Sequence, residues 1–122
     1  SDAAVCLMHM QGTPRTMQEA PCYEDAVSEI RNFFEERLRT LEVAGVAREQ
    51  VVIDPGVGFG KTLNHNLKLI AGIPAFIQLQ RPLLLGVSRK SFIGKLLGAG
   101  VENRLPASLA CAAWAVIHGT QI

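Results

Sequence analysis

Short apolar runs alternate along the chain with longer segments that carry apolar residues at helical spacing. The apolar runs cover residues 3–8, 51–53 and 82–87, and each predicts a strand that is buried on both faces. Residues 119–122 have the pattern of the start of a fourth strand. Strands of this kind, separated by helices, indicate a parallel sheet that is covered by helices.

The segments between the apolar runs predict helices. Residues 24–44 place apolar side chains on one stripe, and residues 63–80 have a helical pattern that a glycine and a proline interrupt. Residues 88–97 and 103–118 predict two further helices, and the second of these is apolar on nearly every side. The chain is therefore predicted to repeat a strand-then-helix unit.

Two α/β architectures satisfy this pattern, an open doubly wound sheet and a (β/α) barrel. A complete barrel needs about 250 residues. The chain has 122 residues, so it would form close to half of one. No low-complexity segment or change in composition divides the chain, which predicts a single unit over residues 1–122.

Composition excludes several classes of function. The chain has 12 basic and 11 acidic residues and no basic run interleaved with aromatic residues, which argues against binding to nucleic acid. Its longest apolar stretch, 105–117, is too short for a membrane helix, and no secretory signal opens the chain. Cys6, Cys22 and Cys111 lack the spacing of metal ligands, which predicts reduced thiols, a cytoplasmic location and no structural metal site.

Polar and glycine-rich turns follow each of the three predicted strands. They cover residues 9–12, 54–56 and 88–91. Because the carboxyl ends of parallel strands line one crevice, we expect these turns to lie close together. The sequence thus predicts one ligand site that is built from three distant segments.

The chemistry of these turns suggests a ligand with donors at one end and a negative group at the other. Asp54 offers a carboxylate acceptor at the end of a buried strand. Ser88 is expected to cap the next helix, whose first amides, together with Lys90, would bind an anion. The edge of a pterin or a guanine presents two adjacent N–H donors to one carboxylate. Met8 and Phe59 could contact such a flat ring.

Other motifs are weaker. The glycines at 56, 58 and 60 do not have the spacing of the dinucleotide fingerprint. The run Gly60-Lys61-Thr62 is similar to the end of a P-loop, but Pro55 stands where a P-loop needs glycine. His9 could touch a ligand, although a buried core histidine is the simpler interpretation.

Three motifs give the chain a close resemblance to the bacterial dihydropteroate synthase family. They lie at residues 8–18, 54–61 and 86–91, and the resemblance extends over the whole chain in order. It implies the C-terminal half of a (β/α)8 TIM barrel, from about the fifth strand to the start of the eighth. The family joins p-aminobenzoate to dihydropterin pyrophosphate in folate synthesis, releases pyrophosphate with the help of Mg2+, and is the target of sulfonamides.

The resemblance also implies roles for individual residues. Asp54 would bind the pyrimidine edge of the pterin. Lys90 would lie against the pterin, contact its ring acceptors and also face p-aminobenzoate. Ser91, with the helix amides, would hold the p-aminobenzoate carboxylate. The further residues implied to line the two substrate sites are Met8, Gly58, Phe59 and Gly86.

The chain lacks the family's early strands and its last strand, and two expectations follow. The 122-residue polypeptide alone should not turn over, and the ligands of Mg2+ should lie outside it. Exposed sheet edges and core side chains should also lead to a homodimer or other self-association. Two alternatives stay open: a fragment that binds pterin or sulfonamide without catalysis, and a methyltetrahydrofolate methyltransferase, which should lack the motif at residues 88–91.

Overall fold

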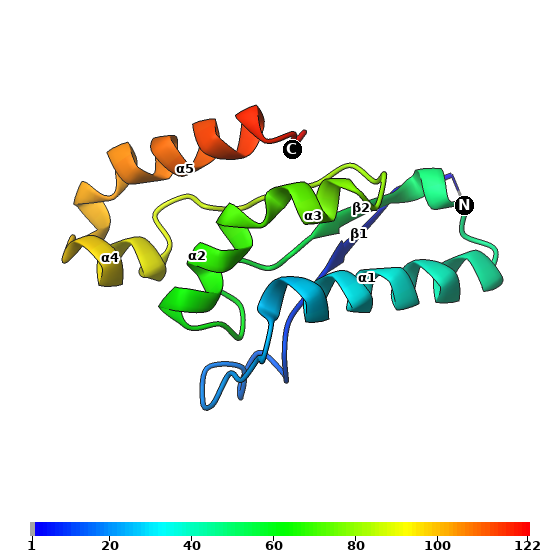
Figure 1. Ribbon diagram of the computed structural model, residues 1–122, viewed down its shortest axis with the longest axis horizontal. Coiled ribbons are helices and arrows are strands. Elements are labelled where there is room, and N and C mark those ends of the chain that lie inside the picture. Colours follow the sequence, from blue (N-terminus) through cyan, green and yellow to red (C-terminus); the bar gives the residue numbers. More distant parts are fainter. Residues whose placement is uncertain (1) are drawn as a thin grey trace.

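The computed structural model describes residues 2–122, and its elements follow the predicted alternation of strands and helices (Figure 1). In chain order they are β1 (Val5–Met8), α1 (Ala26–Val43), η1 (Arg48–Gln50), β2 (Val51–Asp54), α2 (Leu63–Ala71), α3 (Ile73–Ile77), α4 (Ser91–Leu97), η2 (Val101–Asn103) and α5 (Leu105–Ile117).

The strands β1 and β2 form a parallel ladder whose two faces differ. Leu7 lies opposite Ile53 on the face that the helices cover, and Ile53 is fully buried. Met8 lies opposite Asp54 on the other face, where Met8 is exposed. The prediction that the first strand is buried on both faces is therefore wrong. Alternate side chains of a strand point to opposite faces, and here only one face is covered.

The predicted strand at 82–87 is extended and runs beside β2, but it forms only one bridge. Ile53 donates its N–H to Pro82 O, and Leu84 donates its N–H to Ile53 O. Pro82 has no N–H, so the ladder cannot continue toward the start of this segment. On its other side, Leu85 donates its N–H to the carbonyl oxygen of Ile122, so the last residues lie where a fourth strand was expected.

The helix α1 supplies the centre of the core. Asp25 caps its first turn by accepting a hydrogen bond from Ser28 N at 3.2 Å. Ile30, Phe34 and Leu38 follow at a spacing of four residues and are fully buried. The predicted helix at 24–44 is confirmed, with its apolar stripe packed against the strands.

The break in the predicted helix at 63–80 falls at Gly72, between α2 and α3. A β-carbon on Gly72 would lie 2.7 Å from Val27 Cγ2, so a larger residue would push α1 away. Pro74 follows in the first turn of α3, where its missing N–H needs no partner. The glycine thus both ends α2 and permits close packing on α1.

The turn before α4 differs from the prediction that Ser88 caps a helix. The helix begins at Ser91, and Lys90 occupies the N-cap position without capping the helix through its side chain. Arg89 has a φ of 49°, which removes it from the helix. Its N–H donates to Ser108 Oγ at 2.8 Å. Contact with α5 therefore sets this turn, which the local sequence could not indicate.

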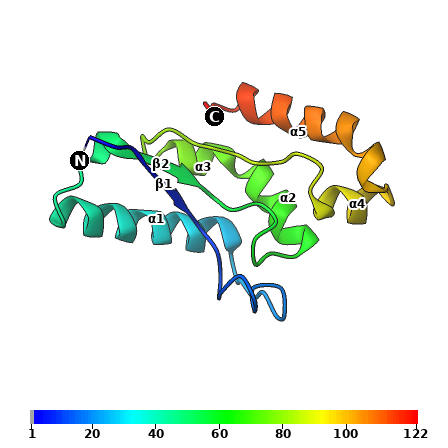
Figure 2. The ribbon, with the colours of Figure 1, turned by 180° about the vertical axis from the view of Figure 1, so that it is seen from behind.

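The helices α1 and α5 lie at the two ends of the row of helices, with α2 and α3 between them, as Figures 1 and 2 both show. In α5, Leu109, Val116 and Ile117 are 61%, 68% and 79% exposed. Every helix within residues 2–122 is too short or too polar to span a bilayer.

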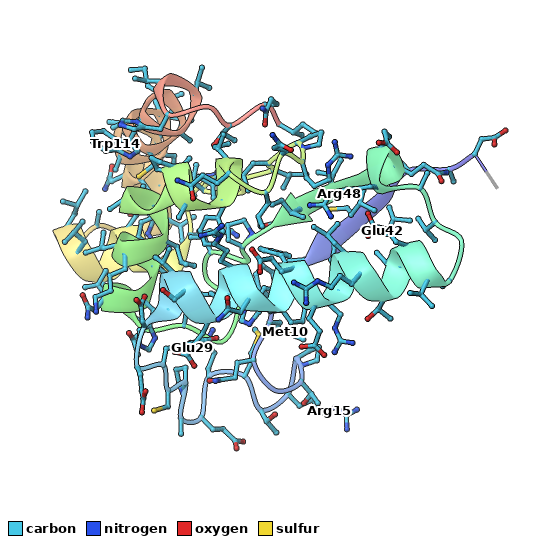
Figure 3. The ribbon with its side chains drawn as sticks, turned by 45° about the vertical axis from the view of Figure 1, so that its right-hand side comes forward. Met10, Arg15, Glu29, Glu42, Arg48 and Trp114 are labelled. Carbon is cyan, nitrogen blue, oxygen red and sulfur yellow. The ribbon has the colours of Figure 1, made fainter. Side chains whose placement is uncertain are left out.

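The loop between β1 and α1 projects from the body of the molecule. Figure 3 shows Arg15 on this loop, pointing away from the rest of the chain. The base of the loop is closed by two hydrogen bonds between the Gln11 side chain and the backbone of Cys22, at 2.9 and 3.0 Å. A third contact joins its outer part to the site: Gln18 Nε2 donates to Gly58 O at 2.8 Å.

Candidate functional site at the carboxyl ends of the strands

The three predicted turns meet at the carboxyl ends of the strands. His9 donates its N–H to Asp54 O at 2.9 Å, which joins the first turn to the second. Lys90, from the third turn, donates from Nζ to the carbonyl oxygen of Val57. The predicted convergence of these distant segments is confirmed.

Asp54 presents a half-buried carboxylate. Its Oδ1 accepts a hydrogen bond from Gly56 N at 2.8 Å, whereas Oδ2 has no hydrogen-bond partner among residues 2–122. Burial raises the pKa of this carboxyl, and the Gly56 N–H and the charges of Lys90 and Lys61 oppose that rise. The carboxylate is oriented by one bond and keeps acceptor capacity for a ligand.

Lys90 lies in a space that two glycines leave open. Its Nζ is 4.9 Å from the centroid of the Phe59 ring. A β-carbon on Gly58 would be 3.3 Å from Lys90 Cδ, and one on Gly86 would be 3.4 Å from Lys90 Nζ. Burial lowers the pKa of Lys90, and the charge of Asp54 opposes this shift. Phe59, Gly58 and Gly86 therefore all border the same ammonium group.

Ser91 lies at the start of α4 and is exposed. It borders a cavity of about 270 Å³ whose lining is rich in hydrogen-bond donors. The lining residues are Gln18, Lys61, Leu63, Asn66, Ser91, Phe92 and Lys95. Asp54 is not among them, so the carboxylate and this cavity are separate parts of the site.

Lys61 is a site residue that sequence reasoning missed. It is 3% exposed, and its Nζ donates to Phe59 O at 2.7 Å and lies 3.2 Å from His9 Nδ1. Burial lowers its pKa to about 8, while the nearby carboxylate of Asp54 opposes the shift. The sequence suggested Lys61 only as part of a P-loop, and no local pattern shows that its side chain turns back toward His9 and the carbonyl oxygen of Phe59.

His9 is buried beside Lys61 and packs on aromatic rings. Its ring lies 4.9 Å from that of Phe33, edge to face. Burial, and then the charge of Lys61, lower the pKa of His9 to about 4. A neutral His9 can accept a hydrogen bond from Lys61 at Nδ1. The interpretation as a core histidine is confirmed.

Magnesium does not fit the residues that surround this site. Among residues 2–122, no group of three His, Cys, Asp or Glu side chains could hold a metal ion. The one carboxylate at the site, Asp54, feels two lysine charges, which would repel a cation. The Mg2+ that the resemblance implies stays a prediction.

Comparison with known proteins identifies the family. The pterin binding enzyme family matches residues 1–122. The chain belongs to the pterin binding enzymes. The dihydropteroate synthase of Escherichia coli K12 is 52% identical over 118 residues, which are 97% of this chain and 42% of that protein.

Solved structures of pterin binding enzymes confirm the fold. The Yersinia pestis dihydropteroate synthase in a sulfonamide drug complex has a TM-score of 0.95 and 43% identity, over 99% of this chain and 44% of that one. The Xanthomonas albilineans enzyme in complex with 7,8-dihydropteroate has a TM-score of 0.88 and 38% identity, over 98% and 43%. The fold is part of a TIM barrel, as predicted, and the chain spans less than half the length of these relatives.

Proposed function

We propose that the protein carrying this chain is a dihydropteroate synthase, which condenses dihydropterin pyrophosphate with p-aminobenzoate. The observation that carries the proposal is the free acceptor of Asp54, next to Lys90 and on the same face as Met8. A pterin edge offers two N–H donors to such a carboxylate. The relatives solved with a sulfonamide and with 7,8-dihydropteroate support the choice of ligands.

In the proposed reaction, the bond between the pterin methylene carbon and the pyrophosphate oxygen breaks. Pyrophosphate leaves with the electron pair, and the aniline nitrogen of p-aminobenzoate attacks the electron-poor carbon and loses a proton. Asp54 would orient the pterin. Lys90 would contact the ring acceptors of the pterin and face p-aminobenzoate as well, and Ser91 would hold the p-aminobenzoate carboxylate. Met8 and Gly86 would border the pterin, and Gly58 and Phe59 the junction of the two substrates.

The remaining partner assignments are proposals of the same kind. The substrates are small molecules, Mg2+ would assist the leaving group from ligands outside residues 2–122, and the location would be cytoplasmic. We also propose that the chain self-associates, because its last helix is apolar and exposed.

The decisive experiment uses the complete protein and measures release of pyrophosphate that depends on both substrates. Asp54→Asn replaces one acceptor oxygen by a donor, so pterin affinity should fall about 100-fold. Asp25→Asn is a matched control, because asparagine also caps helices well and Asp25 lies outside the site.

Two results would contradict the proposal. One is a complete protein without condensation activity, and the other is an Asp54→Asn variant that binds pterin as tightly as the control. The 122-residue chain alone, assayed in parallel, should show no turnover, because it matches only 42% of the Escherichia coli enzyme.

A further inference from the structure

Three consecutive residues support the Lys90 side chain. Val57 O accepts a hydrogen bond from Lys90 Nζ, and the Phe59 ring lies below the same ammonium. Between them, Gly58 is so close that a β-carbon would sit 3.3 Å from Lys90 Cδ. The position of Lys90 therefore depends on where the peptide groups of Gly58 are held.

Two side chains from elsewhere in the chain hold both peptide groups of Gly58. Asn66 Oδ1, on α2, accepts a hydrogen bond from Gly58 N at 2.8 Å. Gln18 Nε2, on the projecting loop, donates to Gly58 O at 2.8 Å. Gly58 has a φ of 88°, outside regular secondary structure, so these side chains replace the partners that a strand or helix would provide.

Asn66 is a buried polar residue whose side-chain amide binds Gly58. It is only 3% exposed, and burying an amide in a helix is unfavourable unless the amide is hydrogen-bonded. Its side-chain oxygen accepts from Gly58 N, outside the helix. A leucine would suit the packing of α2 but would leave the Gly58 N–H without a partner.

The pterin acceptor is held separately. Asp54 takes its orientation from Gly56 N and from the strand ladder, and neither contact involves Asn66 or Gln18. A change at Asn66 should therefore act on Lys90 and Phe59 more than on Asp54.

We propose that Asn66, together with Gln18, is a positioning residue that fixes Gly58, and through it Lys90 and Phe59, for the second substrate. The proposal rests on the proposed function, since it assigns the Lys90–Phe59 side of the site to p-aminobenzoate. It predicts a graded effect: loss of the clamp that Asn66 and Gln18 form on Gly58 should weaken p-aminobenzoate binding more than pterin binding, because Asp54 is oriented by other contacts.

The test uses the complete protein with Asn66→Leu, Asn66→Asp and Gln18→Ala. Asn66→Leu should raise the KM for p-aminobenzoate about tenfold, with pterin affinity changed less than about threefold. Asn66→Asp should restore most of the loss, because its carboxylate still accepts from Gly58 N and Lys61 borders the same cavity. Gln18→Ala should shift the KM in the same direction by a smaller factor.

Matched controls separate positioning from general loss of structure. Asn64→Leu changes an exposed asparagine on the same helix, and Gln78→Ala changes an exposed glutamine at the end of α3; both should leave the two constants unchanged. Gln18 is exposed, so its variant should fold even if Asn66→Leu does not.

Three results would each contradict this positioning role. They are equal effects on both substrates, no effect of Gln18→Ala, and no recovery of the KM in Asn66→Asp. Failure of the proposed function would look different, because the unmodified protein would then show no condensation to measure.

Discussion

Lys61 and Asp54 show how one buried cation and one half-buried carboxylate share a site without an ion pair. Lys61 Nζ is 3.4 Å from the carbonyl oxygen of His9 and donates to that of Phe59 at 2.7 Å, yet its charge still stabilises the ionised form of Asp54. Since the proposed pterin binding needs that ionised form, pterin affinity should decline as the pH falls through the raised pKa of Asp54.

Lys61 itself should titrate near pH 8. Burial disfavours its ammonium form, so the folded chain binds the proton less tightly than the unfolded chain, whose lysine pKa is about 10.5. The free energy of unfolding should therefore rise as the pH increases from about 8 to 10.5, and Lys61→Met should abolish that rise.

NMR of lysines labelled at the ε-carbon measures the pKa of Lys61 directly in the complete protein. One resonance should shift with a midpoint near pH 8, and it should be missing in Lys61→Met. A Lys61 resonance that moves only together with those of the exposed lysines would contradict the assignment.

At the scale of elements, the connection from β2 to α2 lies very close to the backbone of the turn that follows β1. Gly56 has a φ of 71°, and a β-carbon there would sit 2.0 Å from His9 O. Gly45, after α1, has a φ of 87° but nothing within 4 Å of a β-carbon. Both glycines therefore need a positive φ, but only Gly45 has room for a β-carbon.

This difference predicts unequal effects of alanine. Gly45→Ala should lower the free energy of unfolding by about 1 kcal/mol, because alanine disfavours the left-handed backbone. Gly56→Ala adds a clash with the backbone of the neighbouring turn and should cost on the order of 3 kcal/mol. Chemical denaturation of both variants measures the difference between their free energies of unfolding. Equal losses would show that the turn at Gly56 relaxes freely.

The sequence predicts elements well where the signal is local. The stripe on α1, the break at Gly72 and the acceptor at Asp54 all follow from residue spacing. The start of α4 at Ser91 and the contact of Lys61 with His9 do not, because partners distant in the sequence set them. Arg89 adopts its turn through Ser108 of α5, and Lys61 finds its partners at His9.

At the scale of the whole molecule, apolar surface gathers on the last helix. Leu109, Val116 and Ile117 are more than half exposed, and within residues 2–122 the strand β1 pairs with β2 alone. Exposed apolar surface and open strand edges both favour association with another chain. In the 122-residue chain, the available partner is a second copy.

We therefore expect the 122-residue chain to self-associate through α5. Replacing Leu109 or Val116 by glutamate places a charge in the contact, which should shift the chain toward monomer because a buried, unpaired charge is costly. Val43→Glu is the matched control, since Val43 is 91% exposed at the end of α1, far from α5 (Figure 1). Light scattering coupled to size exclusion gives the mass of each variant. A monomeric parent chain at millimolar concentration would exclude association altogether, and an equal effect of Val43→Glu would place the contact elsewhere on the surface.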